Sequence, residues 1–369
     1  MIKFLLSKLT FILFLIVQLL AFNVSAQPDT ETRAVWVTTN YRLDWPSSIG
    51  NSELQRKELK KIFEDIKAKG FNTVYFQVRS SGTVLFNSKY ESIPNYFSDT
   101  NNTTLNFDPS KYAIESAREI GLKIHAWVNM IRCYSRNGHK DFLNKNHVIK
   151  KHPGWIVEHR EGNKTTYWLD PGLPETRKYL LNLVEEITVK YNFDGIQFDY
   201  LRYPGKNFDD QFSYSAYGKN QNIHDWRRDN INKILIDAKR VIKRLKPNML
   251  IGAAPIGIYK NGYDYYALQG YSDVYQDSYF WLENDLVDYL VPQIYWGLKG
   301  KPNFIDISKT WLRNSFDKNI ILGIGAFKPE VYSDLEEIIE QAQKSRAAGF
   351  AIFRYGDIKE IMIKVPARN

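Results

Sequence analysis

The chain has 369 residues, of which 44% are hydrophobic and 15% aromatic, and its one cysteine is Cys133. This composition allows a substantial core and excludes a low-complexity or disulfide-stapled protein. The formal net charge is +9, but lysine and arginine are spread along the chain, and the one dense basic run, Lys239–Lys246, lies in a predicted helix. We therefore expect a solvated helix face at this run and no nucleic-acid partner.

The first 26 residues have the pattern of a cleaved export signal. Lys3 and Lys8 supply positive charge, Leu9–Phe22 is almost entirely apolar, and residues 24–26 (V-S-A) are small, as a cleavage site requires. We expect a signal peptide at 1–26 and a periplasmic or extracellular mature protein without a transmembrane segment. An uncleaved anchor is the alternative, although the apolar stretch is short for a membrane span.

Strand-like and helical patterns alternate along the mature chain. Eight apolar segments read as strands: Arg33–Thr38, Asn72–Val78, Leu122–Asn129, Phe193–Phe198, Met249–Pro255, Val287–Tyr295, Asn319–Gly325 and Gly349–Phe353. Helical patterns fall between them: Glu53–Lys69, Pro109–Ile120, Pro174–Lys190, Asp225–Lys246, Tyr279–Asn284, Ile305–Phe316 and Ser333–Ala348, with a stub at Asp357–Ile363. Ser333 and Glu336 suggest a capping box for the helix before the last strand.

This alternation predicts an α/β fold, a single (β/α)8 TIM barrel over residues 27–369. An inserted β-hairpin is expected between strands three and four, with Trp155–His159 and Thr165–Leu169 flanking residues 160–163. An open doubly wound sheet is the structural alternative, but no glycine-rich phosphate turn follows an early strand.

Candidate catalytic residues are sought at the C-terminal strand ends, where barrel enzymes place their active sites. Asp199 directly follows the fourth strand and is the expected principal catalytic carboxylate. Asp194 precedes the same strand and is expected to be structural. Glycoside hydrolysis normally uses a second carboxyl group, for which Asp277 is the choice. The other carboxylates that remain open for this role are Asp44, Glu158, Asp264, Asp273 and Glu283; a route in which a substrate N-acetyl group replaces the second carboxylate is also open.

The other polar and aromatic residues near the strand ends suit a polyhydroxylated ligand, which needs hydrogen bonds and flat stacking surfaces. The expected substrate-binding residues are Asp44, Trp45, Gln77, Arg79, His125, Trp127, Asn129, Arg132, Arg202, Tyr203, Tyr259, Gln293, Tyr295 and Trp296. The six histidines show no zinc-ligand spacing, so neither a metal nor a cofactor is expected. The expected partner is a polysaccharide or oligosaccharide, and no obligate protein partner is evident.

Several motifs occur in order along the mature chain. They are R-A-V-W-V-T-T with D-W-P (33–46), F-N-T-V-Y-F-Q-V-R (71–79), G-L-K-I-H-A-W-V-N-M-I-R (121–132), L-D-P-G-L-P-E-T-R (169–177), F-D-G-I-Q-F-D-Y-L-R-Y-P (193–204) and D-Y-L-V-P-Q-I-Y-W (288–296). Together they resemble the glycosyl hydrolase-like 10 family of exported bacterial barrel proteins. The resemblance implies a (β/α)8 fold and a glycan hydrolase. Many members carry two adjacent acids, F-D-D-Y, where this chain has Phe198-Asp199-Tyr200. Adjacent strand residues face opposite sides, so we expect only one acid to enter the barrel.

The sequence therefore predicts a secreted glycoside hydrolase that cleaves a polysaccharide, with peptidoglycan glycan strands as one candidate. Two alternatives remain open. The first is a carbohydrate-binding barrel without catalysis. The second is a sugar esterase or deacetylase, although the chain lacks the G-x-S-x-G elbow of serine hydrolases.

Overall fold

The computed structural model describes residues 31–97, 107–135, 145–262 and 264–368. One compact unit, Thr32–Pro366, holds all the helices and strands named below. The export signal predicted at residues 1–26 lies outside the described residues. Among the described helices, none has both the length and the hydropathy that crossing a membrane requires.

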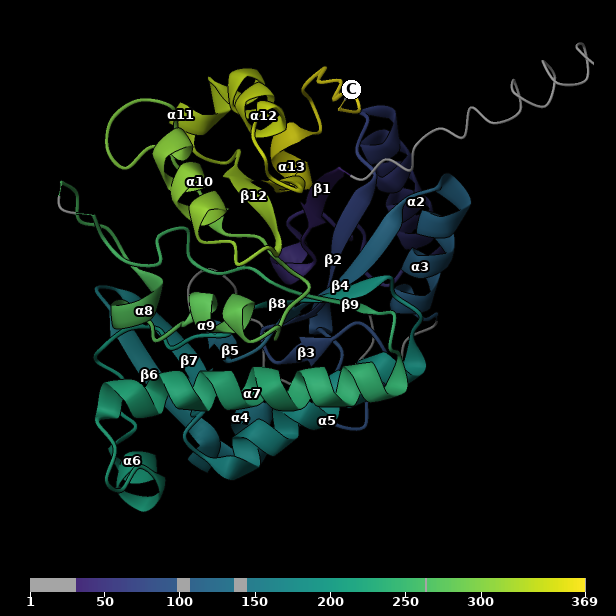
Figure 1. The fold of residues 1–369 in the computed structure, drawn as a ribbon. Helices are drawn as coiled ribbons and strands as arrows, with labels where there is room; N and C mark the ends of the chain where they lie inside the picture. The colour runs from purple at the N-terminus through teal and green to yellow at the C-terminus, as the bar shows by residue number, and fades with distance from the viewer. Residues whose placement is uncertain (1–30, 98–106, 136–144, 263, 369) are drawn as a thin grey trace, which may run out of the picture. The chain divides into compact units, whose positions relative to one another are not determined.

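Eight parallel strand positions close into a barrel (Figure 1). In chain order they are β1 (Thr32–Val37), β2 (Thr73–Ser80), β4 (Lys123–Asn129), β8 (Gly195–Asp199), β9 (Leu250–Ala253), β10 (Tyr289–Leu290) continued by β11 (Gln293–Ile294), β12 (Asn319–Gly325) and β13 (Gly349–Phe353). They pair in the order β1-β13-β12-β10-β9-β8-β4-β2, and a β1–β2 pairing closes the ring. The predicted TIM barrel is therefore confirmed, and the open sheet is excluded.

The sixth strand is shorter than predicted because it is divided at Pro292. β10 pairs with β9 and β12, and β11 resumes the pairing with β12 while its Gln293 forms a single parallel bridge to Ile256, just after β9. Proline has no N–H to donate to a strand ladder, so the regular pairing stops there. The Pro292 carbonyl still accepts a hydrogen bond from Gly323 N at 3.0 Å, which holds the two pieces in one line.

Helices cover the outside of the barrel. The longer ones are α2 (Ser52–Ala68), α3 (Pro109–Ile120), α5 (Pro174–Lys190), α7 (Ile223–Leu245), α10 (Phe304–Arg313) and α12 (Leu335–Lys344). The short ones are α4 (Val148–Lys151), α6 (Gln211–Tyr217), α8 (Gly270–Asp273), α9 (Ser278–Glu283), α11 (Pro329–Tyr332), α13 (Tyr355–Ile358) and the 3-10 turns η1 (Asn40–Arg42), η2 (Asn95–Phe97) and η3 (Pro153–Trp155). Figure 1 shows α5 and α7 side by side, in agreement with their contacts.

Local sequence explains where these helices begin and end. In α3, the Asp108 side chain accepts a hydrogen bond from Lys111 N, Pro109 occupies the first turn, and Gly121 ends the helix with φ 76°. The predicted capping box at Ser333 is wrong, because Ser333 ends the short helix α11. Helix α12 instead begins after Asp334, whose side chain makes no capping hydrogen bond.

An antiparallel sheet of three strands lies between β4 and β8 in the chain. It consists of β5 (Arg132–Ser135), β6 (Ile156–Glu161) and β7 (Lys164–Leu169), in the order β5-β7-β6. A tight turn joins β6 to β7, and its Gly162 has φ 55°. Leu169 N donates to the Ile131 carbonyl at 3.0 Å, so the end of β7 is tied to the segment that leaves β4.

Two faces of the strands form two different packed regions. Val35, Val74 and Ile196 belong to the large cluster that includes the buried faces of the helices. Their sequence neighbours Trp36 and Tyr75 belong to a second cluster. Because side chains alternate along a strand, this second cluster fills the barrel interior. Glycine makes room there: an added Cβ at Gly252 would lie 2.1 Å from the Tyr289 ring.

Candidate active site

A cavity of about 280 Å³ opens at the C-terminal ends of the barrel strands. Eight of the predicted site residues line it: Gln77, Trp127, Asn129, Arg132, Asp199, Arg202, Gln293 and Tyr295. The lining residues outside the predicted binding set are Thr38, Asn40, Leu43, Ser81, Tyr200, Phe327 and Phe353. Of these, Tyr200 follows Asp199 directly, and the adjacency was a signal that could have identified it.

Asp199 is the centre of this cavity's chemistry. It ends β8, and β8 pairs with β4 and β9 on either side, so the end of the strand is fixed. Asp199 Oδ2 accepts a hydrogen bond from Trp127 Nε1 at 3.1 Å. Its Oδ1 accepts from Tyr200 N at 2.7 Å and from Gln293 Nε2 at 3.3 Å. The carboxyl group is therefore held in one orientation by three donors from three segments of the chain.

Burial raises the pKa of Asp199, because the residue is only 7% exposed and the charged form is poorly solvated. The Tyr200 N–H, the charge of Arg202 and the two side-chain hydrogen bonds act in the opposite direction but do not cancel the effect. A carboxyl group that keeps its proton to higher pH can act as a general acid. Among the described residues that line the cavity, Asp199 is the one carboxylate.

Tyr200 contacts two arginine side chains. The guanidinium carbons of Arg132 and Arg202 lie 5.2 Å and 5.0 Å from the centre of its ring. Arg132 Nη1 also donates to the Tyr200 hydroxyl at 2.9 Å. Both arginines line the cavity, and neither is within ion-pair distance of a carboxylate in the described part of the chain, although Arg202 lies close enough to Asp199 for their charges to interact. This charge is available to an anionic group on a ligand.

The backbone of Tyr200 is held in an unusual conformation. Its φ is 50°, in the left-handed region that a bulky residue rarely occupies. This conformation accompanies the hydrogen bond from Tyr200 N back to the Asp199 side chain. Strained backbone of this kind concentrates at functional sites, where the surrounding structure holds it in place.

Aromatic rings form one wall of the cavity. The ring centres of Trp127 and Phe353 are 6.1 Å apart, and those of Tyr295 and Phe327 are 5.5 Å apart. Tyr295 and Phe353 are also in contact, with ring centres 5.9 Å apart. Flat apolar faces next to hydrogen-bonding groups are the surface that a sugar ring requires.

Gln77 shapes the opposite side of the cavity. Its Oε1 accepts hydrogen bonds from Thr38 Oγ1 at 2.8 Å, Thr39 N at 3.0 Å and Asn40 N at 2.8 Å. The side chain therefore fixes the loop that follows β1. Gln77 lines the cavity, but its side-chain oxygen already accepts three hydrogen bonds from the protein and is not available to a ligand.

Two predicted ligand contacts, Arg79 and His125, are corrected by the structure. Arg79 is 1% exposed, binds Glu91 through two hydrogen bonds at 2.9 and 2.5 Å, and donates to the Met130 carbonyl at 2.7 Å. His125 lies in the barrel core, where its Nδ1 is 2.7 Å from the Tyr289 hydroxyl. Burial lowers the pKa of His125 to about 3, so the ring is neutral. Both residues are structural.

Three further predicted contacts, Asp44, Trp45 and Tyr203, are also buried in the protein. The Asp44 carboxylate pairs with Arg354 and accepts hydrogen bonds from Thr38 N and Gly356 N, which joins the loop after β1 to the loop after β13. Trp45 and Tyr203 are both 0% exposed. None of the three lines the cavity.

The structure does not bring Asp277 into the cavity with Asp199. Asp277 is the N-cap of α9, where its Oδ1 accepts hydrogen bonds from Phe280 N at 3.4 Å and from the Tyr259 hydroxyl at 2.7 Å. Two further predicted contacts, Tyr259 and Trp296, do not line the cavity. Tyr259 stacks on Tyr279, and the ring of Trp296 lies near Lys328. Asp194 has the structural role expected of it, because its Oδ2 accepts from Ile124 N at 2.8 Å.

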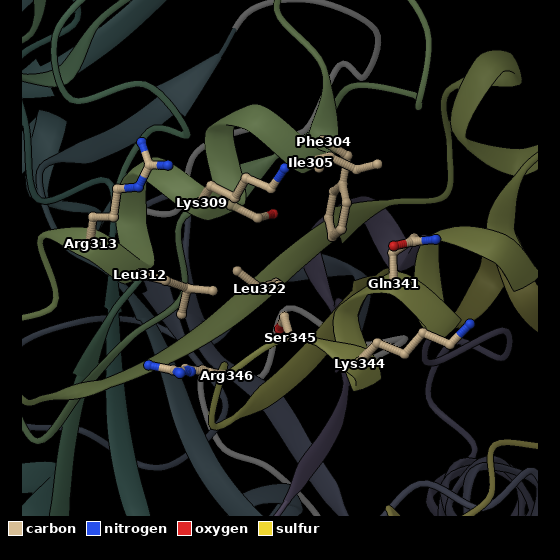
Figure 2. A pocket seen from close by; sticks show the side chains of 11 residues that line it. Phe304, Ile305, Lys309, Leu312, Arg313, Leu322, Gln341, Lys344, Ser345 and Arg346 are labelled. Atoms are coloured by element: carbon tan, nitrogen blue, oxygen red, sulfur yellow. The ribbon is translucent and has the colours of Figure 1, made fainter.

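A larger cavity of about 490 Å³ lies outside the barrel, between α10 and α12. Figure 2 shows Lys309 and Arg313 on one side of it, Lys344 on the other, and Leu322 of β12 between the two helices. None of the described residues that line it carries a carboxyl group. It therefore offers no acid for glycoside chemistry. Across the described residues, no cluster of histidine, cysteine and acidic side chains could hold a metal ion.

Comparison with known proteins agrees with the fold and gives the family. The family model described as glycosyl hydrolase-like 10 matches residues 31–344. The glycosyl hydrolase YngK of Bacillus subtilis (strain 168) is 31% identical over 347 residues, which cover 88% of this chain and 67% of YngK. The glycosyl hydrolase DigH of Escherichia coli (strain K12) is 30% identical over 309 residues, covering 78% of this chain and 70% of DigH.

Solved structures are similar in fold at low sequence identity. The glycoside hydrolase domain of PgaB (BpsB) from Bordetella bronchiseptica has a TM-score of 0.64 at 13% identity, covering 91% of this chain and 99% of that domain. The catalytic domain of β-amylase from Paenibacillus polymyxa has a TM-score of 0.57 at 14% identity, covering 92% and 96%. The family model and the curated relatives confirm the resemblance seen in the motifs. The chain belongs to the glycosyl hydrolase-like 10 family and is a glycoside hydrolase.

Proposed function

We propose that this protein hydrolyses glycosidic bonds within a polysaccharide and that Asp199 is its catalytic acid. The observation that carries the proposal is the position of Asp199 at the end of β8: it is buried, held by three hydrogen bonds, and lines the cavity at the barrel mouth. Its raised pKa favours the protonated form that an acid catalyst needs.

In this reaction, Asp199 donates its proton to the glycosidic oxygen as the bond to the sugar C1 breaks. The carboxylate that remains is stabilised by Trp127 Nε1 and Tyr200 N, which already point at its two oxygens. The aromatic wall formed by Trp127, Tyr295 and Phe353 positions the sugar ring.

The two unpaired arginines support an acidic glycan as substrate. Arg132 and Arg202 both contact the ring of Tyr200, which follows the catalytic group in the chain. Glycan strands of peptidoglycan fit this chemistry, because their muramic acid units carry a carboxylate once the stem peptides are removed. The signal sequence predicted at residues 1–26 supports a location outside the cytoplasm, where such strands occur.

A carbohydrate-binding barrel without catalysis is the second candidate. It is favoured by the absence of a second carboxylate among the described residues that line the cavity. The two candidates differ in whether product is released, so one experiment separates them.

The test is incubation of the mature protein with a glycan panel, including peptidoglycan strands with and without stem peptides, followed by measurement of new reducing ends. Asp199→Asn should abolish product release while retaining the fold. Asp277→Asn is the matched control, because asparagine caps a helix as well as aspartate does, and it should cleave at the wild-type rate. Equal product release by Asp199→Asn and wild type would overturn the role of Asp199. Glycan binding without any cleavage would favour the second candidate.

A further inference from the structure

The side chain of Asn129 presents an unsatisfied acceptor beside the catalytic acid. Asn129 ends β4 and is the register partner of Asp199 on β8. The residue is only 6% exposed, yet its Oδ1 is buried and has no hydrogen-bond partner in the described part of the chain. Leaving a buried acceptor unpaired is unfavourable, so a ligand that supplies a donor at this point relieves the cost.

The surroundings of Asn129 distinguish between possible donors. Asn129 lines the cavity together with Tyr295, Phe327 and Phe353, which present apolar surface. An acetamido group matches this combination, because it has one N–H to donate and a methyl group to bury. A sugar hydroxyl offers a donor but has no methyl group to bury against these rings.

The chemistry of the cavity requires a nucleophile as well as an acid. Paired glycosidase carboxyl groups lie about 5 to 9.5 Å apart. The described lining of the cavity supplies one carboxylate, Asp199, and Asp277 is occupied as the cap of α9. A carbonyl oxygen on the substrate can take the place of the second carboxylate.

We propose that Asn129 and Asp199 form a subsite for a 2-acetamido sugar whose own acetamido oxygen is the nucleophile. The inference rests on the proposed function, because Asp199 is the acid in both. The acetamido N–H donates to Asn129 Oδ1. The acetamido oxygen forms a bond to C1 while the glycosidic C1–O bond breaks, and Asp199 transfers its proton to the departing oxygen.

The second half of the reaction restores the enzyme. The first half leaves a positively charged bicyclic oxazolinium ion and the Asp199 carboxylate. Water then attacks C1, its proton passes to Asp199, and the bond between C1 and the acetamido oxygen opens. Two displacements at C1 retain the anomeric configuration of the sugar, and Asn129 holds the N–H throughout.

The test uses one glycan in two acylated forms and wild-type protein. Peptidoglycan strands without stem peptides are N-deacetylated and then re-acylated with either acetyl or trifluoroacetyl groups, which share the amide N–H and carbonyl but differ greatly in the nucleophilicity of the carbonyl oxygen. Re-acetylated strands should be cleaved with retention of configuration. Trifluoroacetylated strands should be cleaved at least roughly 100-fold more slowly than re-acetylated strands, because the intramolecular nucleophile is weaker.

The outcomes separate the two proposals. Equal cleavage of both strands, or inversion at C1, overturns the acetamido mechanism and leaves Asp199 as a catalytic acid. Failure to cleave any strand of the panel overturns both. Asn129→Ala provides a second measurement in the non-cleaving Asp199→Asn background: affinity for the acetylated strand should fall about tenfold, the equivalent of one hydrogen bond. Unchanged affinity contradicts the contact with Asn129.

Discussion

Trp127 Nε1 donates a hydrogen bond to Asp199 Oδ2 at 3.1 Å. The two residues lie on the adjacent strands β4 and β8, and Trp127 is two residues before Asn129, the register partner of Asp199. The indole thus holds the carboxyl group from β4 while forming part of the aromatic wall. One side chain therefore links the orientation of the acid to the surface expected to contact the sugar.

Replacing Trp127 tests this link. Trp127→Phe removes the N–H that lowers the pKa of Asp199, so the pKa should rise further. With Asp199 active in its protonated form, the alkaline limb of the pH profile of kcat/KM should move to higher pH, and kcat should fall about tenfold because the carboxylate left after proton transfer loses a donor. An alkaline limb that stays in place would contradict the assignment of that limb to Asp199.

The two arginines beside Tyr200 predict a salt-sensitive interaction with acidic glycans. Arg132→Gln and Arg202→Gln should each weaken binding of strands that carry free carboxylates, and each should flatten the dependence of affinity on salt. Neutral glycans of the same length should bind the variants and wild type alike. Equal losses for acidic and neutral glycans would show that the arginines act through packing and not through charge.

The buried pair of Arg79 and Glu91 predicts a structural effect. Both side chains are 0% exposed, and Glu91 also accepts a hydrogen bond from the Tyr179 hydroxyl at 2.8 Å. Glu91→Ala should lower the free energy of unfolding by about 3–5 kcal/mol, because it leaves the Arg79 charge buried without its partner. The control is Glu119→Ala, which removes the exposed pair with Lys60 and should leave the free energy of unfolding almost unchanged. Similar midpoints for the two variants in urea would contradict this role.

The raised pKa of Asp170 should make the stability of the protein depend on pH. Burial, with a contribution from the charge of Asp210, raises the pKa of Asp170 from 3.8 to about 6. The folded protein therefore holds this proton more tightly than the unfolded chain. The contribution of Asp170 to the free energy of unfolding is fully present below its pKa in the unfolded chain. This contribution, up to roughly 3 kcal/mol, is lost as pH rises to its pKa in the folded protein.

The variant that isolates this effect is Asp170→Asn, which keeps an oxygen for the hydrogen bond from Gly172 N. The difference in unfolding free energy between wild type and variant should change between about pH 4 and about pH 6 and be constant above that range. A difference that is flat across the whole range would show that Asp170 has an ordinary pKa.

Much of the fold was predictable because the strand patterns are local. The run that ends at Asp199 contains the apolar residues Ile196 and Phe198, and alternation fixes which of its side chains enter the barrel. The division of the sixth strand depends on Pro292, whose missing N–H is evident in the sequence but whose effect on pairing depends on both neighbours. The capping box at Ser333 failed because a separate short helix ends at that residue.

The candidate site was harder to predict because alternation gives the face of a strand and not the depth along the barrel. His125 and Trp127 lie on the same face of β4, yet His125 is one layer deeper and is enclosed by Tyr75 and Tyr289. Arg79 was misjudged for another reason. The pairing of β2 with β4 shifts register between Gln77 and Arg79, which breaks the alternation that the prediction assumed.

The most direct test of the catalytic claim compares two leaving groups with the Asp199→Ala variant. A natural glycan needs a proton on the departing oxygen, whereas a dinitrophenyl glycoside of the same sugar has a leaving group that departs without one. The account predicts that Asp199→Ala loses cleavage of the natural strand by about 100-fold or more while its kcat/KM on the dinitrophenyl glycoside stays close to wild type. Equal losses on both substrates would contradict the role of Asp199 as the catalytic acid.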